Sequence, residues 1–555
     1  MEVTLVVGVL IVLAIAGATS FAQRFGVASP LILVVAGILV SLLPFVPAVD
    51  IQPELILAGI LPPLLYSASV SMPAMNFRRE FGAIGGLSVL LVVISSVVLG
   101  LFFSLAIPEL GLAWGIALGA IVSPTDAVAT NIVKRAGVSP RVVAILEGES
   151  LLNDATALVL LRAAIAAGAA SFAFGTVIWS FVYSVVIAVV LGWVVGRVNL
   201  LVRARVTDAT VNTVISFTVP FLASLPAEAL GASGLVAAVV AGLVTGSRAP
   251  RVLSPQHRLS DSQNWRMVEL MLEGLVFLTM GLQLFGILEE VEQDHAGVLP
   301  AVGIAAAALV LTLLVRTAYV VPLLYSLARR ARRGERMRPH IETLQERLQD
   351  PEAANAEFAK RGGSRKGRSP SARDLGRFTA RLRRTLADLR YFAAAPLGWR
   401  EGTIVVWAGM RGAVTVAAAQ TLPQQETPGR SFLVLIAFLV AAGSLLLQGG
   451  TIGWVLRLVK PAKADPEVQR EERTRLLTML FEASDAVPLP ATPERTQESW
   501  GEVKAARLEL IRVQRKALLD ARDDGAFDAD VLESALVNLD ADEISIALKG
   551  GPTAT

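Results

Sequence analysis

Residues 142–161 read VVAILEGESLLNDATALVLL, an apolar run long enough to cross a bilayer that nevertheless carries three carboxylates and an asparagine. Helical spacing places Glu147 and Asp154 on one face, and Glu149 and Asn153 on another. Ionisable side chains at bilayer depth are costly, which makes them candidates for function. Burial and neighbouring negative charge both favour the protonated form of a carboxylic acid, so at least one of these groups should hold a proton near neutral pH unless a cation compensates. The alternative is a polar cluster that only joins helices together.

The preceding apolar stretch, residues 116–133 (IALGAIVSPTDAVATNIV), is expected to form an interrupted helix. Pro124 cannot donate a backbone hydrogen bond and crowds the preceding turn, so the helix should break beside Thr125 and Asp126. Discontinuous helices of transporters place freed carbonyls and half-helix ends at ion sites near the bilayer midplane. A helix N-cap that follows a loop is the alternative interpretation of this Ser-Pro-Thr-Asp sequence.

Two arginines occur in other apolar runs and need counter-charges. Arg316, in ALVLTLLVRTAYVVPL, is expected to pair with Glu149, because an unpaired guanidinium would be prohibitive at that depth. Arg411, in WAGMRGAVTVAAAQ, stands between Gly409 and Gly412, which weaken the helix and predict a second interrupted span. The alternative for Arg411 is a side chain that snorkels to the cytoplasmic surface.

Composition places the chain among polytopic membrane proteins. Of its 555 residues 54% are hydrophobic and only 17% are charged, against about a quarter in soluble proteins. Cysteine is absent, which excludes disulfides and thiolate metal sites, and the three histidines (His257, His295 and His340) fall in polar stretches. No GxxxxGK[ST] phosphate loop marks nucleotide hydrolysis as an energy source. A channel or a gradient-driven carrier remains.

The apolar runs predict about thirteen transmembrane helices in an all-α protein. Basic connections alternate with connections poor in Lys and Arg, so the positive-inside rule places the N-terminus outside and the C-terminus in the cytoplasm. A cleaved signal peptide in place of the first span is disfavoured, because no basic n-region precedes it. The runs are 3–20, 29–46, 54–72, 83–106, 113–133, 142–167, 171–196, 209–227, 231–247, 267–287, 297–326, 400–422 and 431–457.

These runs divide the chain into a transmembrane domain, 1–460, with a cytoplasmic insert at 329–399, and a cytosolic C-terminal domain, 461–555. Residues 329–400 hold 19 Lys/Arg against 8 Asp/Glu, whereas 461–555 hold 12 against 19. The composition of the insert suits a flexible loop against the anionic inner leaflet, with nucleic-acid binding as the less favoured alternative. Apolar residues at helical spacing in the tail predict a small helical domain, which we expect to be regulatory.

The chain resembles the cation/proton antiporter 1 family, the sodium/proton exchangers, over most of residues 1–460. The resemblance is carried by several motifs in order: ILPPLLYSA at 60–68, SPTDAVAT at 123–130, EGESLLNDATALVL at 147–160, GLVFLTMGLQL at 274–284 and GMRGAV at 409–414. It implies inverted six-helix repeats, a homodimer and a core domain that moves to alternate access.

The resemblance also implies roles for individual residues. Asp154 is the expected cation- and proton-binding carboxylate, and Asp126, Ser150 and the backbone at Thr125 complete its site. Asn153 is the neutral partner of the Asn-Asp pair, a pattern that the family associates with electroneutral exchange. The structural ion pair is Glu149 with Arg316. Apart from the resemblance, Arg411, Glu147 and Glu273 are supporting or regulatory candidates because they are charged residues in or beside apolar runs.

Two positions depart from the family pattern. Ser67 stands where many relatives carry Glu or Asp, which bears on cation affinity and preference, and Glu273 stands where many have Asn. Glu269 lies one turn before Glu273, and we expect it at a solvated helix end rather than as a ligand.

We therefore predict a plasma-membrane (inner-membrane) transporter that exchanges Na⁺ for H⁺ without a cofactor and contributes to pH regulation; Li⁺ and K⁺ remain open as cations. The alternatives are a K⁺/H⁺ antiporter, a cation channel, which would need a continuous polar pore lining, and a membrane-embedded enzyme or receptor, for which no nucleophile set or metal-binding cluster is visible. The expected partners are membrane lipids and a second copy of the chain, with no nucleic acid.

Overall fold

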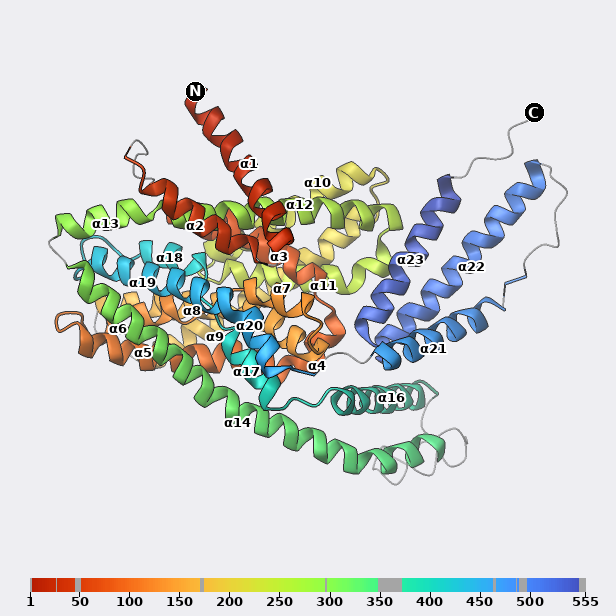
Figure 1. Cartoon of the computed structure of the whole chain (residues 1–555). Coiled ribbons are helices and arrows are strands. Elements are labelled where there is room, and N and C mark those ends of the chain that lie inside the picture. The colour runs from red at the N-terminus through yellow and green to blue at the C-terminus, as the bar shows by residue number, and fades with distance from the viewer. Residues whose placement is uncertain are drawn as a thin grey trace. The chain divides into compact units, whose positions relative to one another are not determined.

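The computed structural model describes residues 2–25, 27–44, 51–169, 174–294, 297–347, 372–462, 466–485, 487–488 and 497–548. All the regular elements in these ranges are helices (Figure 1). The chain forms two compact units. Unit 1 holds Met1–Leu253, His257–Leu323 and Trp399–Ala462, and unit 2 holds Ser254–Gln256, Leu324–Gly398 and Lys463–Thr555.

The helices of unit 1 are mostly apolar, and several contain a π-helical turn (η). They are α1 (Glu2–Phe25), α2 (Ser29–Ser41), η1 (Leu55–Ile60), α3 (Leu61–Ser71), α4 (Ala74–Gly85), η2 (Gly86–Leu91), α5 (Val92–Ala106), α6 (Gly111–Val122), α7 (Val128–Arg135), α8 (Pro140–Ala169), α9 (Phe174–Arg203), α10 (Ala209–Ala229), α11 (Gly234–Val252), α12 (Pro255–Leu282), α13 (Leu284–Gln293), α17 (Trp399–Trp407), α18 (Ala413–Gln420), α19 (Arg430–Ser444), η3 (Leu445–Gly449) and α20 (Gly450–Val459). Helix α14 (Val298–Arg347) contributes residues 298–323 to unit 1 and 324–347 to unit 2.

Nine helical stretches among the described residues are long and apolar enough to cross a membrane. Three shorter apolar stretches cover Ser29–Ser41, Leu55–Ser71 and Gly111–Val122. Each of the thirteen runs expected from the sequence coincides with helical structure, which confirms an all-α polytopic membrane protein; the count of thirteen spans itself is not confirmed. Two of the runs contain a break of several residues, because 113–133 is divided between α6 and α7, and 400–422 between α17 and α18; in 267–287 the single residue Gln283 separates α12 from α13.

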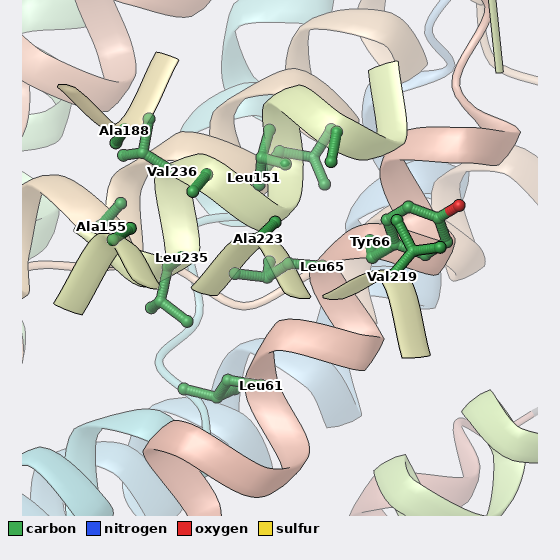
Figure 2. Packing of buried hydrophobic residues seen from close by; sticks show 14 of the residues in the cluster. Leu61, Leu65, Tyr66, Leu151, Ala155, Ala188, Val219, Ala223, Leu235 and Val236 are labelled. Carbon is green, nitrogen blue, oxygen red and sulfur yellow. The ribbon is translucent and has the colours of Figure 1, made fainter. Parts of the chain in front are cut away.

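A buried apolar cluster forms where α3, α8, α9, α10 and α11 meet (Figure 2). Small side chains, among them Ala155, Ala188 and Ala223, bring these helices close together. Glycines do the same elsewhere: a Cβ on Gly242 of α11 would lie 2.7 Å from the carbonyl oxygen of Tyr66 on α3. The close packing of α8 in this cluster fixes the helix that carries most of the polar residues predicted to be functional.

Unit 2 consists of the end of α14 with α16 (Ala372–Ala394), α21 (Pro466–Ser484), α22 (Gln497–Asp524) and α23 (Ala529–Leu548). The helical tail agrees with the prediction. The flexible loop expected for the insert is wrong for 329–347 and 372–394, which are helical, while 348–371 lie outside the described residues. The composition was misleading because a few apolar side chains suffice to pack the helices of the insert together. Leu386 is 2% exposed, and Leu389 of α16 faces Gly334 of α14.

Candidate ion-binding site

The two interrupted spans touch each other at their breaks. Helix α6 ends at Val122 and α7 begins at Val128, while α17 ends at Trp407 and α18 begins at Ala413. The backbone N–H of Asp126, in the first break, donates a hydrogen bond to the carbonyl oxygen of Met410, in the second, at 2.7 Å. Gly412 lies so close to Asp126 that a Cβ at that position would overlap the carboxylate. The breaks therefore form one crossing point.

Carbonyl groups released by the breaks accept hydrogen bonds from side chains. The Val122 oxygen accepts from Arg411 Nε at 3.0 Å, and the Thr125 oxygen accepts from Asn153 Nδ2 at 2.7 Å. The Trp407 oxygen accepts from Gln448 Nε2 at 3.1 Å. Irregular backbone at membrane depth requires such internal partners, and these contacts hold the two breaks open in a fixed geometry.

Arg411 is a structural cation at this crossing. Its side chain is 2% exposed and also donates to the Gly409 carbonyl, and its backbone N–H donates to Ser444 Oγ at 3.0 Å. The alternative of a snorkelling side chain is therefore wrong, because the guanidinium is buried against backbone oxygens. We did not predict Ser444 and Gln448 as part of the site from the sequence. Two polar residues one helical turn apart within the apolar run 431–457 could have indicated them.

A buried hydrogen-bond network joins α8 to the first break and to α14. Arg316 donates to both oxygens of Glu149, at 2.5 and 2.8 Å, and both residues are 2% exposed. The Oγ1 of Thr125 donates to Glu149 Oε1 at 3.0 Å and accepts from Asn153 Nδ2 at 2.9 Å. Arg316 Nε also donates to the Val405 carbonyl of α17 at 3.0 Å. Glu149 is thus fully engaged, and Asn153 positions Thr125.

The carboxylates of Asp126 and Asp154 accept fewer hydrogen bonds than the carboxylate of Glu149. One oxygen of Asp126 accepts from the backbone N–H of Val128 at 3.0 Å. The N-cap residue of α7 is Ala127, with no side-chain cap, so the structure shows the helix break and not the N-cap alternative. Asp154 is close enough to Asp126 for the two charges to repel each other. Among the described residues, no donor bonds to the carboxylate of Asp154. Carboxylates with free lone pairs can bind a proton or a hard cation.

The remaining candidates from the sequence surround this pair. Ser150 Oγ donates to the Glu147 carbonyl within α8 at 3.0 Å, and no hydrogen bond within the described residues joins it to Asp154. Glu147 pairs with the exposed Lys134 at 3.2 Å, outside the buried network. Glu273 lies within electrostatic range of Asp126, Glu269 and Arg135.

The expectation of a solvated helix end for Glu269 is wrong. Helix α12 begins at Pro255, so Glu269 lies in its middle, and its Oε2 accepts a hydrogen bond from Ser67 Oγ at 3.4 Å. The polar residues at 257–264 mislead, because they continue the helix instead of ending it. No group of three or more His, Asp or Glu side chains in the described part of the chain has the arrangement of a metal site.

Comparison with known proteins gives consistent results. A family model described as sodium/hydrogen exchanger, transmembrane, matches residues 9–345 and 378–458. The chain is 34% identical over 288 residues to the uncharacterized Na⁺/H⁺ exchanger YjcE of Escherichia coli K12, covering 50% of this chain and 52% of that protein. It is 25% identical over 587 aligned positions to the Na⁺/H⁺ exchanger Rv2287 of Mycobacterium tuberculosis H37Rv, covering 98% and 96%. The fold is similar to that of the sodium proton antiporter MjNhaP1 from Methanocaldococcus jannaschii at pH 8, with a TM-score of 0.57, 16% identity, and coverage of 83% of this chain and 100% of that one.

Proposed function

The chain belongs to the transmembrane sodium/hydrogen exchanger family, and from this premise we propose that it exchanges Na⁺ for H⁺ by alternating access, with both ions competing for Asp154. The observation that carries the proposal is the position of Asp126 at the crossing of two interrupted helices, where Asn153, the residue before Asp154 on α8, donates a hydrogen bond to the Thr125 carbonyl. The exchange needs no cofactor and no covalent chemistry, so the protein acts as a transporter and not as an enzyme.

Each residue of the site has a distinct task in this proposal. Asp154 holds either the proton or the cation, and Asp126 supplies a second carboxylate oxygen to the cation. The hydroxyl oxygen of Ser150, one turn before Asp154, keeps lone pairs for the cation after it has donated to Glu147. The Thr125 carbonyl, which Asn153 fixes in place, offers its second lone pair. Oxygen ligands alone suit a hard alkali cation.

Competition at one carboxylate is sufficient to couple the two ions. A protonated Asp154 has no charge with which to attract Na⁺, and a bound Na⁺ repels the incoming proton. If the empty site cannot change its side of exposure at an appreciable rate, each Na⁺ that leaves must be replaced by H⁺. The dissipation of one ion's gradient then drives the other ion uphill.

The arrangement of the protein in the cell follows from the same premise. The chain is a multi-pass membrane protein, and we place it in the plasma (inner) membrane with its N-terminus outside and its C-terminus in the cytoplasm. In this proposal residues 1–460 form the transport domain, the insert at 329–399 and the tail at 461–555 face the cytoplasm, and two copies associate as a homodimer.

The test is cation-dependent dissipation of a pH gradient in proteoliposomes that contain the full chain. We expect Na⁺ to dissipate the gradient with wild type and Asp154→Asn to abolish the exchange, because the amide binds neither ion in place of the carboxylate. Glu109→Gln, which removes an exposed carboxylate in the connection between α5 and α6, is the control and should exchange at the wild-type rate. Unchanged exchange by Asp154→Asn would refute the assignment, and parallel assays with Li⁺ and K⁺ measure the cation preference.

A further inference from the structure

One face of α14 carries a stripe of arginines that no ion pair among the described residues engages. Arg329, Arg332, Arg333 and Arg336 are all exposed and fall within about 100° of one another around a helix of 3.6 residues per turn. We call these four residues the arginine stripe. No hydrogen bond or ion pair within the described ranges engages Arg332, Arg333 or Arg336, and the guanidinium of Arg329 lies 5.5 Å from the ring centroid of Tyr325.

The stripe points away from the helix that packs on α14. Gly334, on the opposite side of α14, faces Leu389 of α16. Asp524 of α22, an acidic residue of the same unit, pairs with Arg383 of α16 at 3.3 Å. The stripe is therefore not part of the packing of its own unit.

Along the same face of α14, the exposed side chains are first aliphatic, then aromatic and then basic. Leu314, Val321 and Tyr325, spaced by seven and four residues, are 59%, 60% and 64% exposed and lead directly into the arginine stripe. Spacings of seven and four keep them on one side of the helix. The order of aliphatic, aromatic and basic side chains matches the acyl chains, the interface and the headgroups of a bilayer.

We propose that the arginine stripe binds the headgroups of anionic phospholipids in the leaflet beside residues 329–336 of α14. Guanidinium groups bond phosphate oxygens in a bidentate manner, and they lose less hydration than ammonium groups when they do so. Each basic side chain at an anionic surface contributes about fivefold to the affinity, so three of them amount to about a hundredfold at low ionic strength. The binding does not depend on ion exchange, and Asp154→Asn should bind lipid like wild type.

The test compares phosphatidylglycerol with phosphatidylcholine as ligands for the full chain in a neutral detergent, with bound lipid counted by native mass spectrometry. We expect wild type to prefer phosphatidylglycerol, and the triple variant R329Q/R332Q/R336Q to lose about a hundredfold in affinity at low salt. The matched control R470Q/R473Q/R507Q removes the same charge from exposed arginines of α21 and α22 and should bind like wild type. The preference should also weaken as salt is raised.

A second variant separates loss of binding from loss of folding. R329K/R332K/R336K retains the charge and should keep most of the preference for phosphatidylglycerol, whereas a folding defect would appear as a lowered melting temperature of R329Q/R332Q/R336Q. Equal binding of both lipids by wild type, or unchanged preference in a folded R329Q/R332Q/R336Q, overturns the proposal. It is also overturned if a short DNA duplex binds the arginine stripe more tightly than phosphatidylglycerol does.

Discussion

Gly412 is the position at which the ion site has least room. Its backbone is extended, with φ of −119°, so the space and not the backbone conformation requires glycine. Because an added Cβ would overlap the Asp126 carboxylate, Gly412→Ala must displace either Asp126 or the start of α18. We expect at least a tenfold loss of Na⁺-dependent exchange and an overpacking cost of about 1–3 kcal/mol.

The measurement is the exchange rate in proteoliposomes together with the melting temperature in detergent. Gly453→Ala on α20 is the control, since a Cβ there meets nothing within 4 Å, and it should change neither quantity. If Gly412→Ala exchanges ions at the wild-type rate, the Asp126 carboxylate does not bind the cation from the position that it has in this structure.

The individual charges of the site could be listed from the sequence, because a carboxylate or guanidinium in an apolar run stands out by its cost. What each charge bonds to was harder to predict. Arg411 Nε reaches the carbonyl of Val122, 289 residues away in the chain, and such a contact follows only from the fold. Ser444 and Gln448 have small or neutral polar side chains, which apolar helices tolerate, so they gave a weaker signal.

At the scale of elements, the ion pair of Glu149 and Arg316 joins α8 to α14, and Arg316 extends the connection to α17. Removing one member of a buried pair leaves an uncompensated charge, which costs about 3–5 kcal/mol. We expect Arg316→Met to destabilise the protein by this amount, as measured by denaturant unfolding in detergent. The exposed pair of Arg162 and Glu228 is the control, and Arg162→Met should cost under about 1 kcal/mol.

A double variant distinguishes an ion pair from simple packing. In Glu149→Gln/Arg316→Met the buried charge is gone, so this protein should be more stable than Arg316→Met alone. If the double variant is the less stable of the two, the stabilisation comes from packing of the side chains and not from charge compensation.

Both helix breaks could be predicted from local sequence, since Pro124 and the glycines around Arg411 act on their own turns. The crossing of the two breaks could not, because it depends on contact between Asp126 and Met410, which lie far apart in the chain. The helices of the insert were missed for a related reason. Their apolar positions become buried only against partners in other segments, so composition alone favoured a loop.

For the whole molecule, the charges of the site determine how many ions are exchanged. Asp126, Asp154 and Glu149 bring three negative charges, and Arg316 and Arg411 bring two positive ones, so the unloaded cluster carries one net negative charge. One Na⁺ or one H⁺ neutralises it. Glu273, which lies within electrostatic range of Asp126, Glu269 and Arg135, is not counted among these five charges. The loaded site is therefore neutral in both halves of the transport cycle.

A neutral loaded site predicts exchange that is independent of membrane potential. Moving one net charge through 100 mV is worth about 2.3 kcal/mol, which would shift the final Na⁺ distribution by about fiftyfold. We expect no such shift when proteoliposomes with a fixed pH gradient are clamped with K⁺ and valinomycin at 0 or −100 mV, and Asp154→Asn vesicles correct for passive leaks. A final Na⁺ gradient that follows the imposed potential would show that more than one ion moves in one direction. A further carboxylate, such as Glu273, would then have to take part in the exchange.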